Sequence, residues 1–268
     1  MTSLLKTLVL GGALAAATIT TARAGGVVYV SDGPSNQPWG VNDFTNAFNT
    51  DFGAGNWTSD TFADGTSMFN SSNSFIMIEG GDGNSTDFDN YFNTPGVVTA
   101  AEAWVAAGGS IFINGGRWTY DALDVGFGVT MLQPEYADAS FTGTAAGPSP
   151  IFTPATGTSW GGNYFNHDVV TGAGLSALIL TSSNLDSLAE ENYGLGHVIV
   201  GGLTAPTFWS PQPQGTVLLD NILLYGDDQL AASTPDSTST ITLTLLGAGL
   251  VCVTALRRRR LPIWAARN

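Results

Sequence analysis

Phe75-Ile-Met-Ile-Glu79-Gly-Gly-Asp82 opens the stretch of sequence that decides the fold, and Gly109-Ser-Ile-Phe-Ile-Asn114 closes it. Residues 97–107, between these two apolar runs, have the spacing of a helix, so the stretch predicts a strand, a helix and a strand. A unit of this length fits a right-handed crossover between parallel strands. Ligands of open parallel sheets bind beyond the carboxyl ends of the strands, so we expect any site near Glu79 and Asn114.

Apolar runs in the rest of the chain extend this pattern. Further strands are expected at 27–30, 57–62, 127–132, 168–170, 177–180 and 196–200, and further helices at 41–52 and 214–225. Strands that alternate with helices are typical of a three-layer α/β domain with a mainly parallel sheet, which is the fold class we expect. Residues 145–159 are rich in Gly, Pro, Ser and Thr and are expected to form an exposed excursion.

Charge is distributed unevenly along the chain. The sequence has 8 basic and 22 acidic residues and a formal net charge of −14. Arg117 is the only base between residues 24 and 256, whereas every acidic residue except Asp236 lies between Asp32 and Asp228. Phosphate binding needs clustered Lys and Arg, so no nucleic-acid partner is expected. The acidic middle fits a solvated surface in saline surroundings, or a cation-binding role.

The first 24 residues have the pattern of an export signal. Lys6 precedes an apolar run from Leu8 to Ile19, and Ala22-Arg-Ala24 has the small-x-small spacing of a signal-peptidase site. The mature protein is therefore expected to begin near Gly25, with signal peptidase as a partner. An uncleaved anchor is the competing interpretation.

The carboxyl-terminal part of the sequence has the pattern of a second targeting signal. Pro235, Asp236 and Ser237 precede the apolar run 241–256, which four arginines follow, namely Arg257, Arg258, Arg259 and Arg260. These three parts, in this order, resemble the PEP-CTERM sorting signal that exosortases process, in its variant with a Pro-Asp-Ser core. The sequence departs from that family at Thr234, where Val is usual, and in its extension past the arginines.

The resemblance implies an exosortase as partner, an inner-membrane intermediate, and delivery to the cell envelope, surface or extracellular matrix. An unprocessed tail anchor is the alternative. The expected organisation is a signal peptide at 1–24, the α/β domain at 25–230, a linker with the sorting motif at 231–240, a transmembrane helix at 241–256 and a basic cytoplasmic tail at 257–268. Cys252, the single cysteine, falls in the apolar run, so the domain has no disulfide and no thiol nucleophile.

Five segments of the domain resemble the class I glutamine amidotransferase-like fold, including its trehalose-utilisation-type relatives: 27–33, 75–81, 104–114, 196–202 and 218–225. The resemblance implies a flavodoxin-like sheet. It does not imply the activity, because the family's nucleophilic cysteine would stand in the elbow that here reads Glu79-Gly-Gly-Asp82. The family's His and Glu pair before the final helix has no counterpart in residues 203–214.

Candidate catalytic residues are few. Glu79 directly follows an apolar strand, so partial burial could raise the pKa of its carboxyl and make it an acid or base, or it could serve as a structural hydrogen-bonding group. His167 lies beside a glycine-rich loop, whereas His197 lies within an apolar strand and is expected to be a core residue. A relocated hydrolase site would use Glu79, Asp82 and His167.

Binding residues are equally open. Oxygen ligands recur at Asp82, Asn84, Asp87 and Asp89, which permits weak calcium binding, although the spacing is not that of an EF-hand loop. A solvated polar loop is the simpler interpretation, and no other cofactor is expected. Aromatic side chains in Gly- or Pro-rich contexts suit carbohydrate stacking but suit loop anchoring better; they are Trp39, Trp118, Trp160 and Trp209.

Two function classes follow from these patterns. The first is a non-enzymatic envelope or matrix protein whose catalytically degenerate domain binds a glycan, a cation or a surface protein. The second is a hydrolase with its carboxylates and His167 at the carboxyl edge of the sheet. Convergence of Glu79, Asp82 and His167 on one pocket would distinguish the second from the first.

Overall fold

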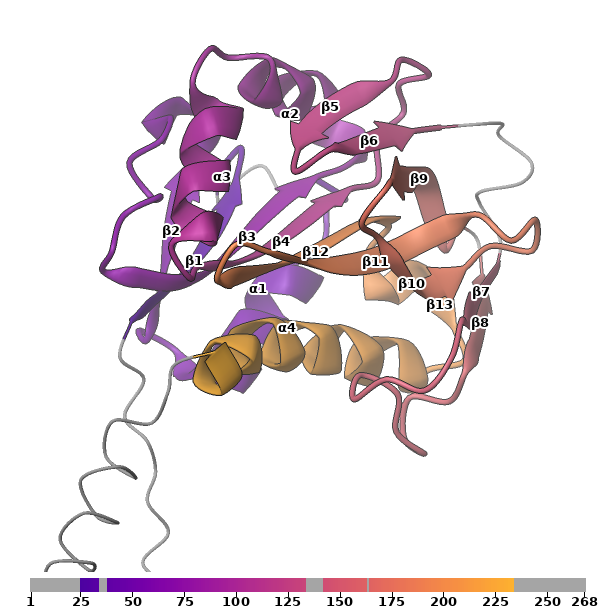
Figure 1. Cartoon of the computed structure of the whole chain (residues 1–268). Helices are drawn as coiled ribbons and strands as arrows, with labels where there is room; N and C mark the ends of the chain where they lie inside the picture. The colour runs from indigo at the N-terminus through magenta and orange to yellow at the C-terminus, as the bar shows by residue number, and fades with distance from the viewer. Residues whose placement is uncertain (1–24, 34–37, 134–141, 163, 234–268) are drawn as a thin grey trace, which may run out of the picture.

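The structure, a computed structural model, describes residues 25–33, 38–133, 142–162 and 164–233. These residues form one sheet of 13 strands, in which β5 and β6 lie beside a path of order β13-β8-β7-β10-β11-β9-β12-β4-β3-β1-β2. Four α-helices pack on the faces of this sheet, as Figure 1 shows.

Five neighbouring strands are parallel: β2 (Trp57–Thr61), β1 (Gly26–Ser31), β3 (Asn73–Gly80), β4 (Ser110–Gly115) and β12 (Gly196–Leu203). The expected crossover is confirmed, because β3 pairs in parallel with β4 in a register that sets Phe75 opposite Ser110. The connection contains α3 (Val97–Ala106) and also α2 (Ser85–Phe92), where only a polar loop was expected.

Apolar side chains cover both faces of these parallel strands, as is typical of strands buried between two layers of helices. Tyr29, Phe75 and Met77 belong to the core beneath α1 (Asp43–Phe48) and α4 (Gln214–Ser233). Val28 and Ile76 point the opposite way, into the core beneath α2 and α3. Figure 1 shows the two helix pairs on opposite sides of the sheet.

The other eight strands extend the sheet beyond β12 and are antiparallel where they pair with one another. They are β5 (Leu123–Gly126), β6 (Val129–Leu132), β7 (Thr142–Ala145), β8 (Ser159–Gly162), β9 (Asn166–Gly172), β10 (Ser176–Leu180), β11 (Asp186–Tyr193) and β13 (Trp209–Ser210). β11 and β9 both pair antiparallel with β12, so the parallel and antiparallel parts share one strand.

This arrangement corrects the predicted fold class. The flavodoxin-like three-layer domain with a mainly parallel sheet is wrong, because eight of the 13 strands lie outside the parallel set and the sheet is mixed. The physical reason is that β5 and β6, β7 and β8, and β10 and β11 are paired as hairpins instead of being joined by crossovers through helices, and hairpins give antiparallel pairs.

A membrane-spanning helix is not found in the part of the chain that the structure describes, and the one predicted at 241–256 lies outside that part. Within the described residues no helix has the length and apolarity needed to cross a bilayer. The last described helix, α4, instead packs on the sheet and runs to Ser233, past the expected domain boundary at 230. The signal peptide at 1–24, the sorting motif at 235–237, the apolar run at 241–256 and the arginines at 257–260 lie outside the described residues.

Candidate functional site

The carboxyl ends of β3, β4 and β12 meet at one edge of the sheet. Asn114 fastens two of them together, since its Nδ2 donates to the Leu203 carbonyl at 2.9 Å and its Oδ1 accepts from the Leu203 N–H at 2.8 Å. The Trp39 ring lies across this edge: a Cβ added to Gly81 would lie 2.6 Å from the ring, and one added to Gly116 would lie 2.8 Å from it. Glycines therefore make room for an indole at the place where the sheet leads us to expect a ligand.

Glu79 ends in the interior beneath this edge. Its side chain is fully buried and accepts a hydrogen bond from the Tyr29 hydroxyl through Oε2, while Oε1 has no partner among the described residues. Burial raises the pKa of Glu79 to about 8, against the opposing effect of Tyr29. The indole N–H of Trp39 also favours the ionised form, although it makes no hydrogen bond of normal geometry. Glu79 is therefore a protonated acid at neutral pH.

His167, on β9, lies beside Trp39 and is enclosed by aromatic rings. Its ring centroid is 4.0 Å from that of Trp118 and 5.3 Å from those of Trp39 and Tyr164. The imidazole is only 1% exposed, and neither ring nitrogen has a hydrogen-bond partner in the described part of the chain. Burial lowers the pKa of His167 to about 4, while a contact with the Arg117 backbone, which does not reach normal hydrogen-bond geometry, opposes that shift. The imidazole is therefore neutral at physiological pH.

Hydrogen bonds fix the main chain that carries two of these rings, those of Tyr164 and Trp118. Tyr164 has a φ of 126°, which is unfavourable for a residue with a side chain, and its carbonyl accepts a hydrogen bond from the Thr204 hydroxyl. Trp118 is held through Ser85, whose Oγ accepts from the Trp118 N–H at 3.1 Å and donates to the Gly81 carbonyl at 2.8 Å. Strained backbone of this kind is found at functional sites more often than elsewhere.

Arg117 is a buried cation beneath the carboxyl edge of the sheet. Its guanidinium is fully buried and lies 2.9 Å from Asp168 Oδ1 and 2.9 Å from Asp89 Oδ1. Its backbone N–H donates to Asp168 Oδ2 at 2.6 Å, so both carboxylate oxygens of Asp168 are engaged. Burial raises the pKa of Asp168 to about 7, and the Arg117 guanidinium counteracts that shift. The cation is thus committed to the protein's own carboxylates.

The structure separates most of the predicted site residues. Asp82 and Asp87 are exposed, Asn84 is buried with its Oδ1 2.7 Å from the Gly81 N–H, and Asp89 faces Arg117. Within the described ranges no three His, Cys, Asp or Glu side chains are grouped so that they could hold a metal ion. Glu79 and His167 both lie beside Trp39, whereas the exposed Asp82 is turned to solvent.

Sequence reasoning missed three contributors to the site, Tyr29, Tyr164 and Arg117, and the tryptophans divide into two kinds. Tyr29 lies within an apolar strand and gave no signal of a polar role, but Arg117 could have been singled out as the lone base among acids. Trp160 and Trp209 are 2% exposed and are anchors. Trp39 and Trp118 remain half-buried at the edge of the sheet.

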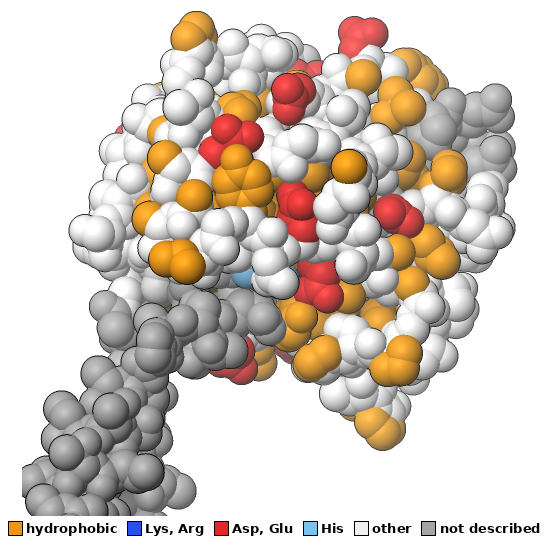
Figure 2. All heavy atoms as spheres, viewed as in Figure 1, with side chains coloured by type: hydrophobic (Ala, Val, Ile, Leu, Met, Phe, Trp, Pro, Cys, Tyr) orange, Lys and Arg blue, Asp and Glu red, His pale blue; other side chains and the backbone are white. Residues whose placement is uncertain are grey.

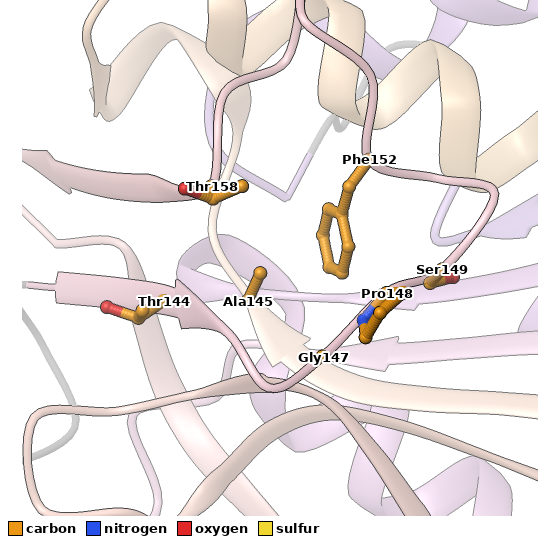
Figure 3. Close-up of a pocket in the computed structure, with 7 residues that line it drawn as sticks. All are labelled: Thr144, Ala145, Gly147, Pro148, Ser149, Phe152 and Thr158. Atoms are coloured by element: carbon orange, nitrogen blue, oxygen red, sulfur yellow. The ribbon is translucent and has the colours of Figure 1, made fainter.

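A shallow hollow lies elsewhere on the molecule, beside the excursion that joins β7 to β8. It has a volume of about 450 Å³, and Figure 3 shows the Phe152 ring pointing in between Ala145 and Pro148. Its lining is formed by Thr144, Ala145, Gly147, Pro148, Ser149, Phe152 and Thr158. No ionisable side chain lines this hollow, so it offers no acid–base chemistry and no charge complementarity.

No protein-family model and no curated protein matches this chain. Among solved structures, a β-galactosidase from Bacillus circulans sp. alkalophilus is similar at 12% identity and a TM-score of 0.48, over 81% of this chain and 33% of that one. A putative GMP synthase subunit from Thermoplasma acidophilum is similar at 10% identity and a TM-score of 0.48, over 78% of this chain and 95% of that one. The chain thus spans about a third of the galactosidase, and neither likeness bears on function.

Proposed function

We propose that this chain is an exported, exosortase-sorted protein of the cell envelope or extracellular matrix whose domain binds a surface glycan without catalysis. One observation carries the binding part: three half-buried rings, those of Trp39, Trp118 and Tyr164, surround the buried His167 at the carboxyl edge of the parallel strands. Aromatic rings with a polar group among them suit a sugar, which has apolar C–H faces and hydroxyl edges.

Charge supports the same proposal. Figure 2 shows acidic side chains scattered over the face in view, and Arg117, the one base between residues 24 and 256, is fully buried. A surface of this kind repels nucleic acids and other polyanions. Export rests on the sequence at the two ends of the chain, which favours signal peptidase, exosortase and the inner membrane as partners in transit.

A hydrolase remains the second candidate because of Glu79. Its raised pKa, about 8, keeps a proton on a carboxyl group at the edge of the sheet, as a general acid requires. Against this function, the Glu79 carboxyl is fully buried and Asp82, its predicted partner, is exposed. A product assay therefore belongs in the test of binding.

The test is calorimetry of the purified full-length chain with neutral, acidic and basic polysaccharides, followed by assay of each mixture for new reducing ends. We expect saturable binding of at least one polysaccharide and no increase in reducing ends. Flat titrations with every polysaccharide would overturn the binding function. New reducing ends that vanish in Glu79→Gln would establish the hydrolase in its place.

A further inference from the structure

His167 is a polar group that the protein encloses and leaves without a hydrogen-bond partner. Both imidazole nitrogens are buried and unpaired in the described part of the chain, and three of the side chains around the ring are aromatic. Buried polar groups are almost always hydrogen-bonded, and each one left unpaired costs about 1–3 kcal/mol. A phenylalanine would fill the same space without this cost, so packing alone does not account for an imidazole here.

The chemistry of the missing partner follows from the imidazole itself. A neutral imidazole offers one N–H donor and one nitrogen acceptor. A hydroxyl group, which donates and accepts, complements either nitrogen, whereas a carboxylate or phosphate only accepts. An anion would also need a cation, but both terminal guanidinium nitrogens of Arg117 are already engaged by Asp89 and Asp168. A neutral partner that carries hydroxyl groups therefore complements this imidazole best.

The rings over His167 are placed so that they could admit such a partner. Trp118 and Tyr164 are half-buried, and neither belongs to a helix or strand. Their ring centroids are 5.7 Å apart, in edge-to-face contact. Rotamer changes of exposed side chains take picoseconds to nanoseconds, and each of these two rings is partly exposed. Turning these two rings outward would uncover the imidazole and leave the indole of Trp39 as the opposite wall.

We infer that His167 is the hydrogen-bonding residue of a closed sugar subsite, which opens when Trp118 and Tyr164 turn aside and then takes one neutral, hydroxyl-bearing unit of a glycan. This inference rests on the proposed function and deepens it by naming the class of glycan and the residue that recognises it. A quaternary ammonium group is the other ligand that aromatic rings attract, but it would gain nothing from the two imidazole nitrogens.

The test uses the two histidines of the chain, His167 and His197, as internal probes. Ring nitrogen and proton NMR signals of the full-length chain are assigned with His197→Phe and followed during titration with neutral oligosaccharides, with hyaluronate as an anionic glycan, and with tetramethylammonium. We expect neutral oligosaccharides to shift the His167 signals, leave those of His197 in place, and quench the fluorescence of the tryptophans.

A variant pair completes the test by calorimetry. His167→Phe should weaken binding of the neutral glycan by at least about tenfold, because it removes a hydrogen bond and keeps the ring. His197→Phe should bind as the unmodified chain does. A glycan that binds with unchanged His167 signals and with unchanged affinity in His167→Phe would overturn this inference while leaving the proposed function intact, as would preferential binding of hyaluronate or tetramethylammonium. A lack of binding to any glycan would overturn both.

Discussion

The two histidines of this chain lie at opposite edges of the sheet in opposite surroundings. At the amino end of β12, His197 Nε2 is 3.0 Å from Glu190 Oε2, which also accepts from the Tyr225 hydroxyl at 2.8 Å. Burial would raise the pKa of Glu190, but the hydrogen bonds from His197 and Tyr225 lower it. At the carboxyl edge, His167 has rings around it and neither nitrogen is paired among the described residues.

This difference assigns a stabilising role to the amino edge and the proposed binding role to the carboxyl edge. The amino edge links its histidine to a carboxylate and a phenol, and within this group of three side chains only His197 Nδ1 is without a partner among the described residues. The carboxyl edge keeps unpaired atoms on Trp39, Glu79 and His167. Unpaired buried atoms cost stability, so their presence at the carboxyl edge fits the closed subsite inferred there.

Arg117→Ala should show the largest effect, because it removes a buried ion pair at the carboxyl edge. It leaves the buried Asp168 without its guanidinium, so we expect a loss of about 3–5 kcal/mol in the free energy of unfolding, measured with urea. Glu190→Gln, at the amino edge, is the matched control, since Glu190 is partly exposed, and should cost much less. Equal losses in the two variants would contradict the proposed difference between the edges.

The pH dependence of stability should come next in size. The pKa of Glu79 is raised by burial to about 8, so the folded state holds a proton that the unfolded chain releases near pH 4.5. Stability of the unmodified chain should therefore fall, relative to Glu79→Gln, as pH rises from about 4.5 to about 8. The slope should approach about 1.4 kcal/mol per pH unit.

Urea unfolding of the unmodified chain and Glu79→Gln at pH 5, 6.5 and 8 measures this slope. Tyr29 does not interfere, because burial and the nearby Glu79 raise its pKa above the ordinary value of a phenol. Two parallel stability profiles would show that Glu79 is ionised in the folded protein. The same carboxyl would then be unsuited to act as a general acid.

Replacing each histidine by phenylalanine should change stability in opposite directions. His167→Phe removes two unpaired nitrogens and should stabilise the fold by about 1–2 kcal/mol, whereas His197→Phe breaks a hydrogen bond to Glu190 and should destabilise it by a similar amount. Urea midpoints at pH 7 measure both changes. Destabilisation by His167→Phe would mean that the imidazole already has a partner, and the two edges would then be alike.

Tyr225→Phe should have the smallest effect. It removes one hydrogen bond to Glu190 and leaves the ring, so we expect a loss of about 0.5–1.5 kcal/mol. Thermal unfolding checks the size of this loss, and glycan titration checks that affinity is unchanged. A change in affinity would mean that the amino edge communicates with the site across the sheet.

The local elements could be predicted far better than their assembly. Residues 75–114 gave the β3–α3–β4 unit because two buried runs and an amphipathic segment have distinct periods. β11 was missed because Asp186–Tyr193 carries three acidic residues, and β8 because Ser-Trp-Gly-Gly has no alternation. The apolar periodicity of a strand or a helix does not show which distant strands pair, or in which direction. A mixed sheet was therefore predicted as a mainly parallel one.

The site could be located from sequence but not assembled from it. The rule that ligands bind at carboxyl ends of parallel strands pointed to Glu79 and Asn114, which do lie at that edge. The neighbourhood of Trp39, Trp118 and His167 depends on two loops and the strand β9, which are far apart in the chain. A contact of this kind is set by tertiary packing, and no spacing in the sequence encodes it.

The burial of Arg117 has a consequence for how this protein responds to proteases. Trypsin cleaves after Lys or Arg, and between residues 24 and 256 only Arg117 offers such a bond. Its side chain is fully buried in the native fold. Native protein should therefore resist trypsin throughout this region, and unfolding should expose a single cut that yields two large fragments. Trypsin with gel electrophoresis thus reports global unfolding as an almost binary signal.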